Sequence, residues 1–96
     1  MIIEQVVLAH FQYIERVAAF LEGSGPEPEL SSPEACTMGE WLKEHPNPEM
    51  AEPHARFHEI LARAVEAKKA GREDEARSLL DQAYPLYSQL ERMLFD

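Results

Sequence analysis

The chain has little cysteine and little positive charge, and each shortage excludes a class of structure or partner. One cysteine in 96 residues rules out a disulfide within the chain. Nine basic residues against 18 acidic ones give a net charge of −9, which opposes binding to nucleic acid and to anionic membranes. No apolar run approaches the roughly 18 residues of a membrane span, and the N-terminus lacks the basic start of a signal peptide. We therefore expect no nucleic-acid partner, no membrane insertion and a cytoplasmic location.

The residues that are present predict a small helical protein. A hydrophobic content of 45% is enough for a core, and the length suits one domain over residues 1–96. Apolar residues recur at helical spacing, and no useful β-type alternation occurs. The expected helices cover about residues 2–21, a short stretch from Pro33 to the break at His45-Pro46, about residues 53–70, and about residues 73–94. The expected fold is an all-α four-helix bundle with three longer helices and one short helix that carries the cysteine.

Glycines and prolines set the expected helix ends. Gly23 and Gly71 are placed as C-terminal stops, and Pro53 is placed as the start of the third helix. Pro85 falls inside the fourth helical pattern, so we expect a kink or a local break there.

The first helical stretch carries more apolar residues than one neighbouring helix would cover. One stripe includes His10, and a second apolar set that includes Tyr13 lies beside it. The excess surface can pack within the bundle or against a second copy, so we expect a homodimer.

His54 and His58 lie four residues apart on the third helix, so both imidazoles can reach one metal ion. They continue the buried stripe that contains Phe57 and Leu61. A buried imidazole needs a partner, because an unpartnered polar group in a core costs about 1–3 kcal/mol. A shared metal would satisfy both rings.

Cys36 is expected in or just after the first helical turn that Ser32 would cap and Pro33 would open. A helix N-terminus favours the thiolate, although a lone cysteine can also be an inert buried residue. Gly39 on the same helix indicates close approach of another backbone, and Trp41 is expected to anchor the core. His45 lies between prolines and is expected to be exposed and no ligand.

His10, Cys36, His54 and His58 together form a complete tetrahedral donor set of the kind that zinc prefers. Iron or copper could use the same donors, and each histidine alone could be an ordinary core residue bonded to a carbonyl. Four protein ligands leave no position for a catalytic water, so we expect no enzyme. A small metal-dependent enzyme, and a structural adaptor in which zinc is only a staple, remain the alternatives.

His10, the segment Cys36-Thr37-Met38-Gly39-Glu40-Trp41-Leu42 and the segment His54-Ala55-Arg56-Phe57-His58 resemble the chemoreceptor zinc-binding (CZB) domain family. The resemblance extends from about residue 10 to residue 94, and Tyr13 stands where the family commonly has tryptophan. It implies a helical bundle, often dimeric, with zinc held by His10, Cys36, His54 and His58.

The resemblance also implies a role in bacterial signalling and chemotaxis, through zinc sensing or hypochlorous-acid sensing in which Cys36 is the redox-sensitive residue. It gives Gly39, Trp41 and Tyr13 supporting roles around the site. Family members usually regulate an attached chemoreceptor or diguanylate cyclase. Because no such domain is seen here, we expect a stand-alone member that acts on a partner of that type in trans.

Overall fold

The structure, a computed structural model, describes residues 3–30 and 36–95, and these form four helices and no strand. The helices are α1 (Ile3–Glu22), α2 (Thr37–Glu44), α3 (Pro48–Lys69) and α4 (Glu73–Phe95). The predicted all-α fold with three longer helices and one short helix is therefore confirmed. None of the described helices combines the length and the apolar character that crossing a bilayer requires.

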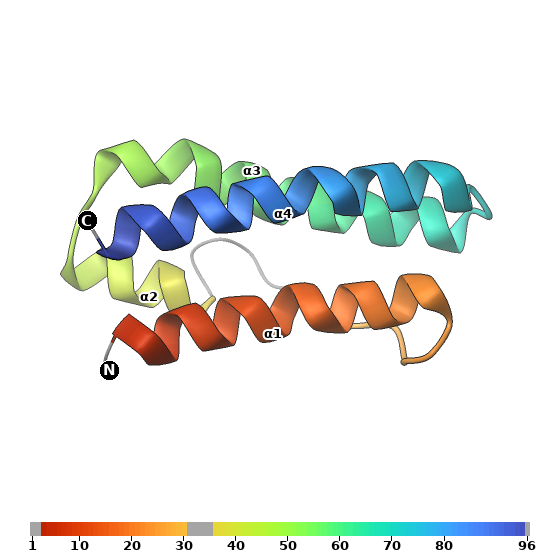
Figure 1. Cartoon of the computed structure of the whole chain (residues 1–96), viewed down its shortest axis with the longest axis horizontal. Helices are drawn as coiled ribbons and strands as arrows, with labels where there is room; N and C mark the ends of the chain where they lie inside the picture. Colours follow the sequence, from red (N-terminus) through yellow and green to blue (C-terminus); the bar gives the residue numbers. More distant parts are fainter. Residues whose placement is uncertain (1–2, 31–35, 96) are drawn as a thin grey trace.

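The bundle is elongated, with dimensions of 39 × 21 × 18 Å. The antiparallel pair α3 and α4 makes the most extensive packing, and α1 lies along this pair (Figure 1). The short α2 packs against α1 near the end of the bundle where both chain termini lie. Only α1 contacts all three other helices, so it links α2 to the α3–α4 pair.

The two predicted glycine stops are confirmed in atomic detail. Gly23 and Gly71 both have φ of +82°, a conformation that favours glycine over residues with a side chain. After α1, the N–H of Ser24 donates to the carbonyl of Ala19 at 2.9 Å. After α3, the N–H of Arg72 donates to the carbonyl of Ala67 at 2.8 Å. Both ends are Schellman motifs, which satisfy carbonyls that the last helical turn leaves open.

The core consists of apolar side chains from all four helices. Its largest fully buried members are Val6, Ile14, Val17, Met38, Met50, Phe57, Leu61 and Leu90. The buried residues of α3 step by three and four from Met50 through His54, Phe57 and Leu61, which is one face of a helix. The histidines therefore share a face with the core, as the sequence predicts.

The predicted start of α3 at Pro53 is wrong. The helix begins at Pro48 after Asn47, whose side chain accepts the N–H of Glu49 at 3.2 Å, and Pro53 lies inside the helix. The hydrogen bond that Pro53 cannot donate would go to the carbonyl of Glu49, an exposed residue that water can solvate. Burial of Met50, which is 1% exposed, favours the extra turn.

Of the kink or local break expected at Pro85, the break does not occur, because α4 continues as one helix through that residue, and the kink stays a prediction. The carbonyl left without a donor is that of Asp81, and both Asp81 and Pro85 are exposed. Water can therefore replace the missing hydrogen bond at small cost.

The short helix begins later than predicted. Cys36 has an extended backbone (φ −79°, ψ 164°) and is the N-cap of α2, so it precedes the first turn. The predicted cap Ser32 and first helical residue Pro33 lie outside the described residues.

Candidate metal centre

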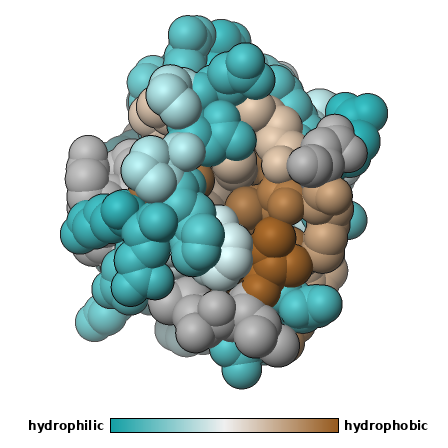
Figure 2. All heavy atoms as spheres, turned by 90° about the vertical axis from the view of Figure 1, so that its left-hand side faces the viewer, coloured by the Kyte–Doolittle hydropathy of each residue, from teal (hydrophilic) through white to brown (hydrophobic). Residues whose placement is uncertain are grey.

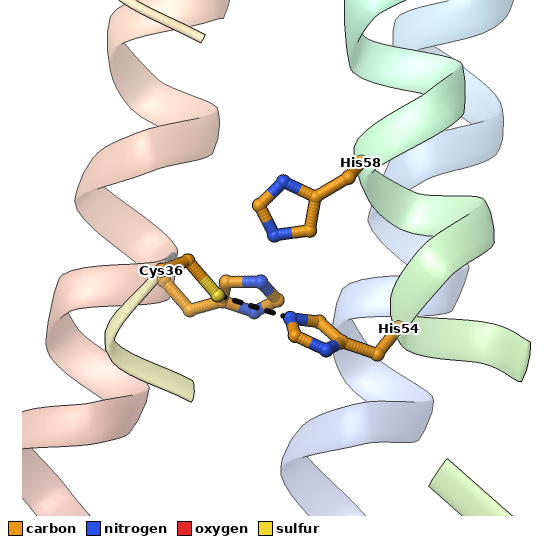
Figure 3. Close-up of side chains that lie close together, drawn as sticks. Cys36, His54 and His58 are labelled. Carbon is orange, nitrogen blue, oxygen red and sulfur yellow. Dashed lines mark hydrogen bonds between the residues drawn. The ribbon is translucent and has the colours of Figure 1, made fainter. Parts of the chain in front are cut away.

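Three helices supply the four candidate ligands. His10 lies in the first half of α1, Cys36 caps α2, and His54 and His58 lie one turn apart on α3. Figure 3 shows Cys36 facing His54 and His58 across the space between the helices. The four residues are far apart in sequence, and the tertiary fold brings them together.

The four donor atoms form one compact group. One ring nitrogen of each histidine and the sulfur of Cys36 all lie within 4.8 Å of one another. The Sγ atom of Cys36 is 3.1 Å from Nε2 of His54, and the ring centroids of His54 and His58 are 4.9 Å apart. Donors around a tetrahedral zinc ion are roughly 3.3–3.6 Å apart, given ligand bonds of about 2.0–2.3 Å. The group therefore needs to contract by only about 1 Å to surround an ion.

His10 shows that this site fits a metal. The residue is 3% exposed, and neither Nδ1 nor Nε2 has a hydrogen-bond partner within the described part of the chain. Burial, and then repulsion by His54 and His58, lowers the pKa of His10 from 6.5 to about 3. The ring is therefore neutral and able to donate a nitrogen lone pair at neutral pH. A coordinated cation would supply the partner that this buried ring lacks in the protein itself.

The electrostatics of Cys36 differ from the expectation. Burial is the largest influence and raises the pKa of the thiol, while the N–H of Gly39, which donates to Sγ at 3.3 Å, lowers it. Further backbone hydrogen bonds at the helix start lower it too, whereas Glu40 raises it. The helix N-terminus thus favours the thiolate as predicted, but burial outweighs it. A bound cation is the group that would make Cys36 ionise at neutral pH.

Aromatic rings lie next to two of the candidate histidine ligands. The ring of Phe57 lies 4.3 Å from that of His10, and the ring of Tyr13 lies 5.2 Å from that of His58. Phe57 is fully buried and Tyr13 is 7% exposed. The supporting role of Tyr13 stays a prediction. Phe57 was expected only as a core residue, and its contact with His10 follows from the pairing of α1 with α3.

Trp41 packs against the buried core, as the sequence predicts, without being fully buried itself. It is half-buried, and its ring stacks on that of His45 at a centroid distance of 3.9 Å and an angle of 13°. His45 is exposed at the C-cap of α2, its Nδ1 lies 3.2 Å from the carbonyl oxygen of Trp41, and it lies outside the ligand group. The stack is local because the two residues are four apart on the same short helix. Gly39 is buried, and its N–H donates to the sulfur of Cys36.

A helical bundle with three histidines and one cysteine gathered in its interior defines a class of metal-binding domain. The family model of the chemoreceptor zinc-binding domain (CZB) matches residues 10–65, which is more than half of the chain and spans all four candidate ligands. The chain belongs to this family. No curated protein and no solved structure is significantly similar to it.

Proposed function

We propose that this domain is a zinc-dependent regulatory module and not an enzyme, with His10, Cys36, His54 and His58 as the zinc ligands. The observation that carries the proposal is the convergence of donors from α1, α2 and α3 within 4.8 Å. Ligands on separate helices couple metal binding to the packing of those helices, so the free energy of binding becomes free energy of folding. Zinc occupancy then changes how firmly α1 and α2 are held to α3.

Oxidation of Cys36 would be the second input. The thiolate sulfur attacks the chlorine of hypochlorous acid, which forms an S–Cl bond and releases hydroxide. Water then displaces chloride and leaves a sulfenic acid, so sulfur has lost two electrons and chlorine has gained them. This removes the only thiolate of the ligand set and weakens zinc binding.

A partner protein would respond to the change in zinc occupancy and helix packing. The chemistry of a reduced thiol favours a cytoplasmic setting, and family membership favours a chemoreceptor or diguanylate cyclase as the partner in trans. A homodimer is supported by exposed apolar side chains on α1, where Leu8 is 55% and Phe11 is 40% exposed. The end of the bundle with both termini also presents an apolar patch (Figure 2).

The main competing function is a structural one, in which zinc only staples a small bundle. Its supporting observation is the burial of His10, His54 and His58, each 5% exposed or less, which suits a permanent site. A catalytic zinc is disfavoured because four protein ligands fill a tetrahedral shell, and no carboxylate belongs to the donor group found among the described residues.

The test is zinc content before and after treatment with hypochlorous acid, read together with helicity and molecular mass. A regulatory module should hold one zinc per chain, release it on mild oxidation and change its helicity or mass. Zinc that stays bound after Cys36 is oxidised would indicate that the metal has only a structural role. A protein that binds no zinc would contradict both functions.

A further inference from the structure

We propose that a hollow beside Cys36 is the entrance through which small anionic electrophiles reach the sulfur, and that Arg16 is the residue that draws them in. The hollow has a volume of about 330 Å³ and lies between α1 and the start of α2. Its lining includes His10, Gln12, Tyr13, Arg16, Cys36 and Thr37. The inference deepens the proposed function, on which it rests, by naming the charge class of reagent that the site favours, which for hypochlorous acid is its conjugate base, hypochlorite.

The hollow gives access to one side of the metal centre only. Cys36 and His10 line it, whereas His54 and His58 do not. Cys36 is half-buried, while each of the three histidines is almost fully buried. The unpartnered ring of His10 is the polar group at the inner wall. A reagent that enters here therefore meets the sulfur at the least protected point of the centre.

The charge at this entrance is positive in a strongly acidic chain. Among the described residues, Arg16 is the one ionised side chain in the lining of the hollow, and its guanidinium carbon lies 5.9 Å from the centroid of the Tyr13 ring. Lys68, Lys69 and Arg72 all form ion pairs with carboxylates, but Arg16 forms none with any described residue. Glu40 raises the pKa of Cys36 but does not line the hollow.

These charges favour anions over neutral reagents of the same size. An occupied centre would carry a net charge of about +1, from a divalent ion and one thiolate, which adds to the charge of Arg16. Oriented positive charge in a recess raises the local concentration of anions, and salt weakens this effect. Arg16 acts as a positioning residue, because it attracts the reagent and takes no part in bond making.

The test compares alkylation of Cys36 by iodoacetate and by iodoacetamide in the zinc-loaded protein. The reagents have nearly the same size, and with both an S–C bond forms as iodide leaves. Only iodoacetate is an anion. The nucleophilicity, the ionisation and the general exposure of the sulfur affect both rate constants equally, so their effects cancel in the ratio of the two. We expect Arg16→Glu to lower this ratio about threefold or more at low salt, and Arg16→Lys to preserve most of it.

The matched control is Arg63→Glu, which makes the same change in net charge at an exposed position of α3 outside the hollow. It should leave the ratio near the wild-type value, and high salt should abolish the difference between the variants. Equal ratios for Arg16→Glu and Arg63→Glu at low salt would overturn the proposal. Zinc content is measured on the same samples. Wild-type protein without zinc would refute the proposed function, whereas full zinc with equal ratios would refute only the anion entrance.

Discussion

His10 shows at the scale of one residue why a metal is needed here. Most buried histidines bond to a carbonyl or a carboxylate, whereas both ring nitrogens of His10 lack such a partner among the described residues. Its surroundings are two more imidazoles, a thiol and the ring of Phe57. Each of the two imidazoles and the thiol can supply an electron pair to a metal ion. A cation shared by all four is the arrangement that satisfies the group.

Replacement of the sulfur should separate ligands from bystanders. We expect Cys36→Ala to weaken zinc binding on the order of 100-fold, because one of four donors and the only negative one is lost. His45→Ala is the control, since that imidazole stacks on Trp41 and lies outside the donor group. Competition with a chromogenic chelator measures both affinities. Equal affinities in the two variants would show that Cys36 is no ligand.

The pKa of His10 predicts how the metal-free protein responds to acid. This pKa is about 3 in the folded protein, whereas the ordinary value of 6.5 applies to the unfolded chain. Between these pH values the unfolded chain binds a proton that the folded chain does not. The free energy of unfolding should therefore fall as the pH falls below about 6.5, by up to about 1.4 kcal/mol per pH unit.

Urea unfolding of the metal-free protein at about pH 7 and about pH 5 measures this dependence. His10→Leu removes the titrating group, so the free energy of unfolding of this variant should depend less steeply on pH than that of the wild type. A slope that is as steep in His10→Leu as in the wild type would assign the acid sensitivity to other residues.

At the scale of helices, α1 and α2 are held less firmly than α3 and α4. The α3–α4 pair shares the most extensive packing and is closed by a tight turn with an ion pair of 2.6 Å between Lys68 and Glu73. Among the described helices, the backbone of the short α2 comes close only to that of α1. The proposed ligands His10 and Cys36 would tie these two helices to α3.

Zinc removal should therefore act unevenly along the chain. We expect amide hydrogen exchange to become faster in α1 and α2 on removal of zinc, with smaller changes in α3 and α4 away from His54 and His58. Mass-spectrometric exchange with and without a chelator measures this pattern. An equal loss of protection in all four helices would mean that zinc stabilises the bundle as one unit.

The sequence predicts the helices well where one local signal decides the outcome. Gly23 and Gly71 end helices because few other residues adopt the required backbone, and the face that contains His54, Phe57 and His58 follows from spacing. The four ligands were also predicted as a set, and the fold brings their donor atoms together.

The errors arise where tertiary structure outweighs a local preference. Pro53 and Pro85 look like breaks in the sequence, yet their missing hydrogen bonds fall at the exposed residues Glu49 and Asp81. The place of Arg16 beside Cys36 depends on how α1 meets the start of α2, which no spacing in the sequence reveals.

At the scale of the whole molecule, a change at the metal centre must reach a surface that another protein can contact. Leu8 and Phe11 are exposed on α1, the same helix that carries His10. The ring of Phe11 lies 5.7 Å from that of Tyr87, so the exposed surface continues onto α4. A contact made through this surface would respond to movement of α1.

Disruption of that surface should change the oligomeric state. We expect the wild type to be a dimer and Phe11→Glu to be largely monomeric, because a buried charge in an apolar interface costs several kcal/mol. Light scattering coupled to size exclusion measures the mass. Glu15→Gln, also on α1 and exposed, is the control. A wild-type protein that stays monomeric at high concentration would show that there is no dimer. A Phe11→Glu variant that is still dimeric would show that the interface lies on another surface.

We propose that one zinc ion sits among the donors of His10, Cys36, His54 and His58. X-ray absorption at the zinc edge measures it most directly. The account predicts one sulfur at about 2.3 Å and three nitrogens at about 2.0–2.1 Å from zinc, with the sulfur contribution lost in Cys36→Ala. A wild-type spectrum without sulfur, or with more than one sulfur per zinc, would contradict it.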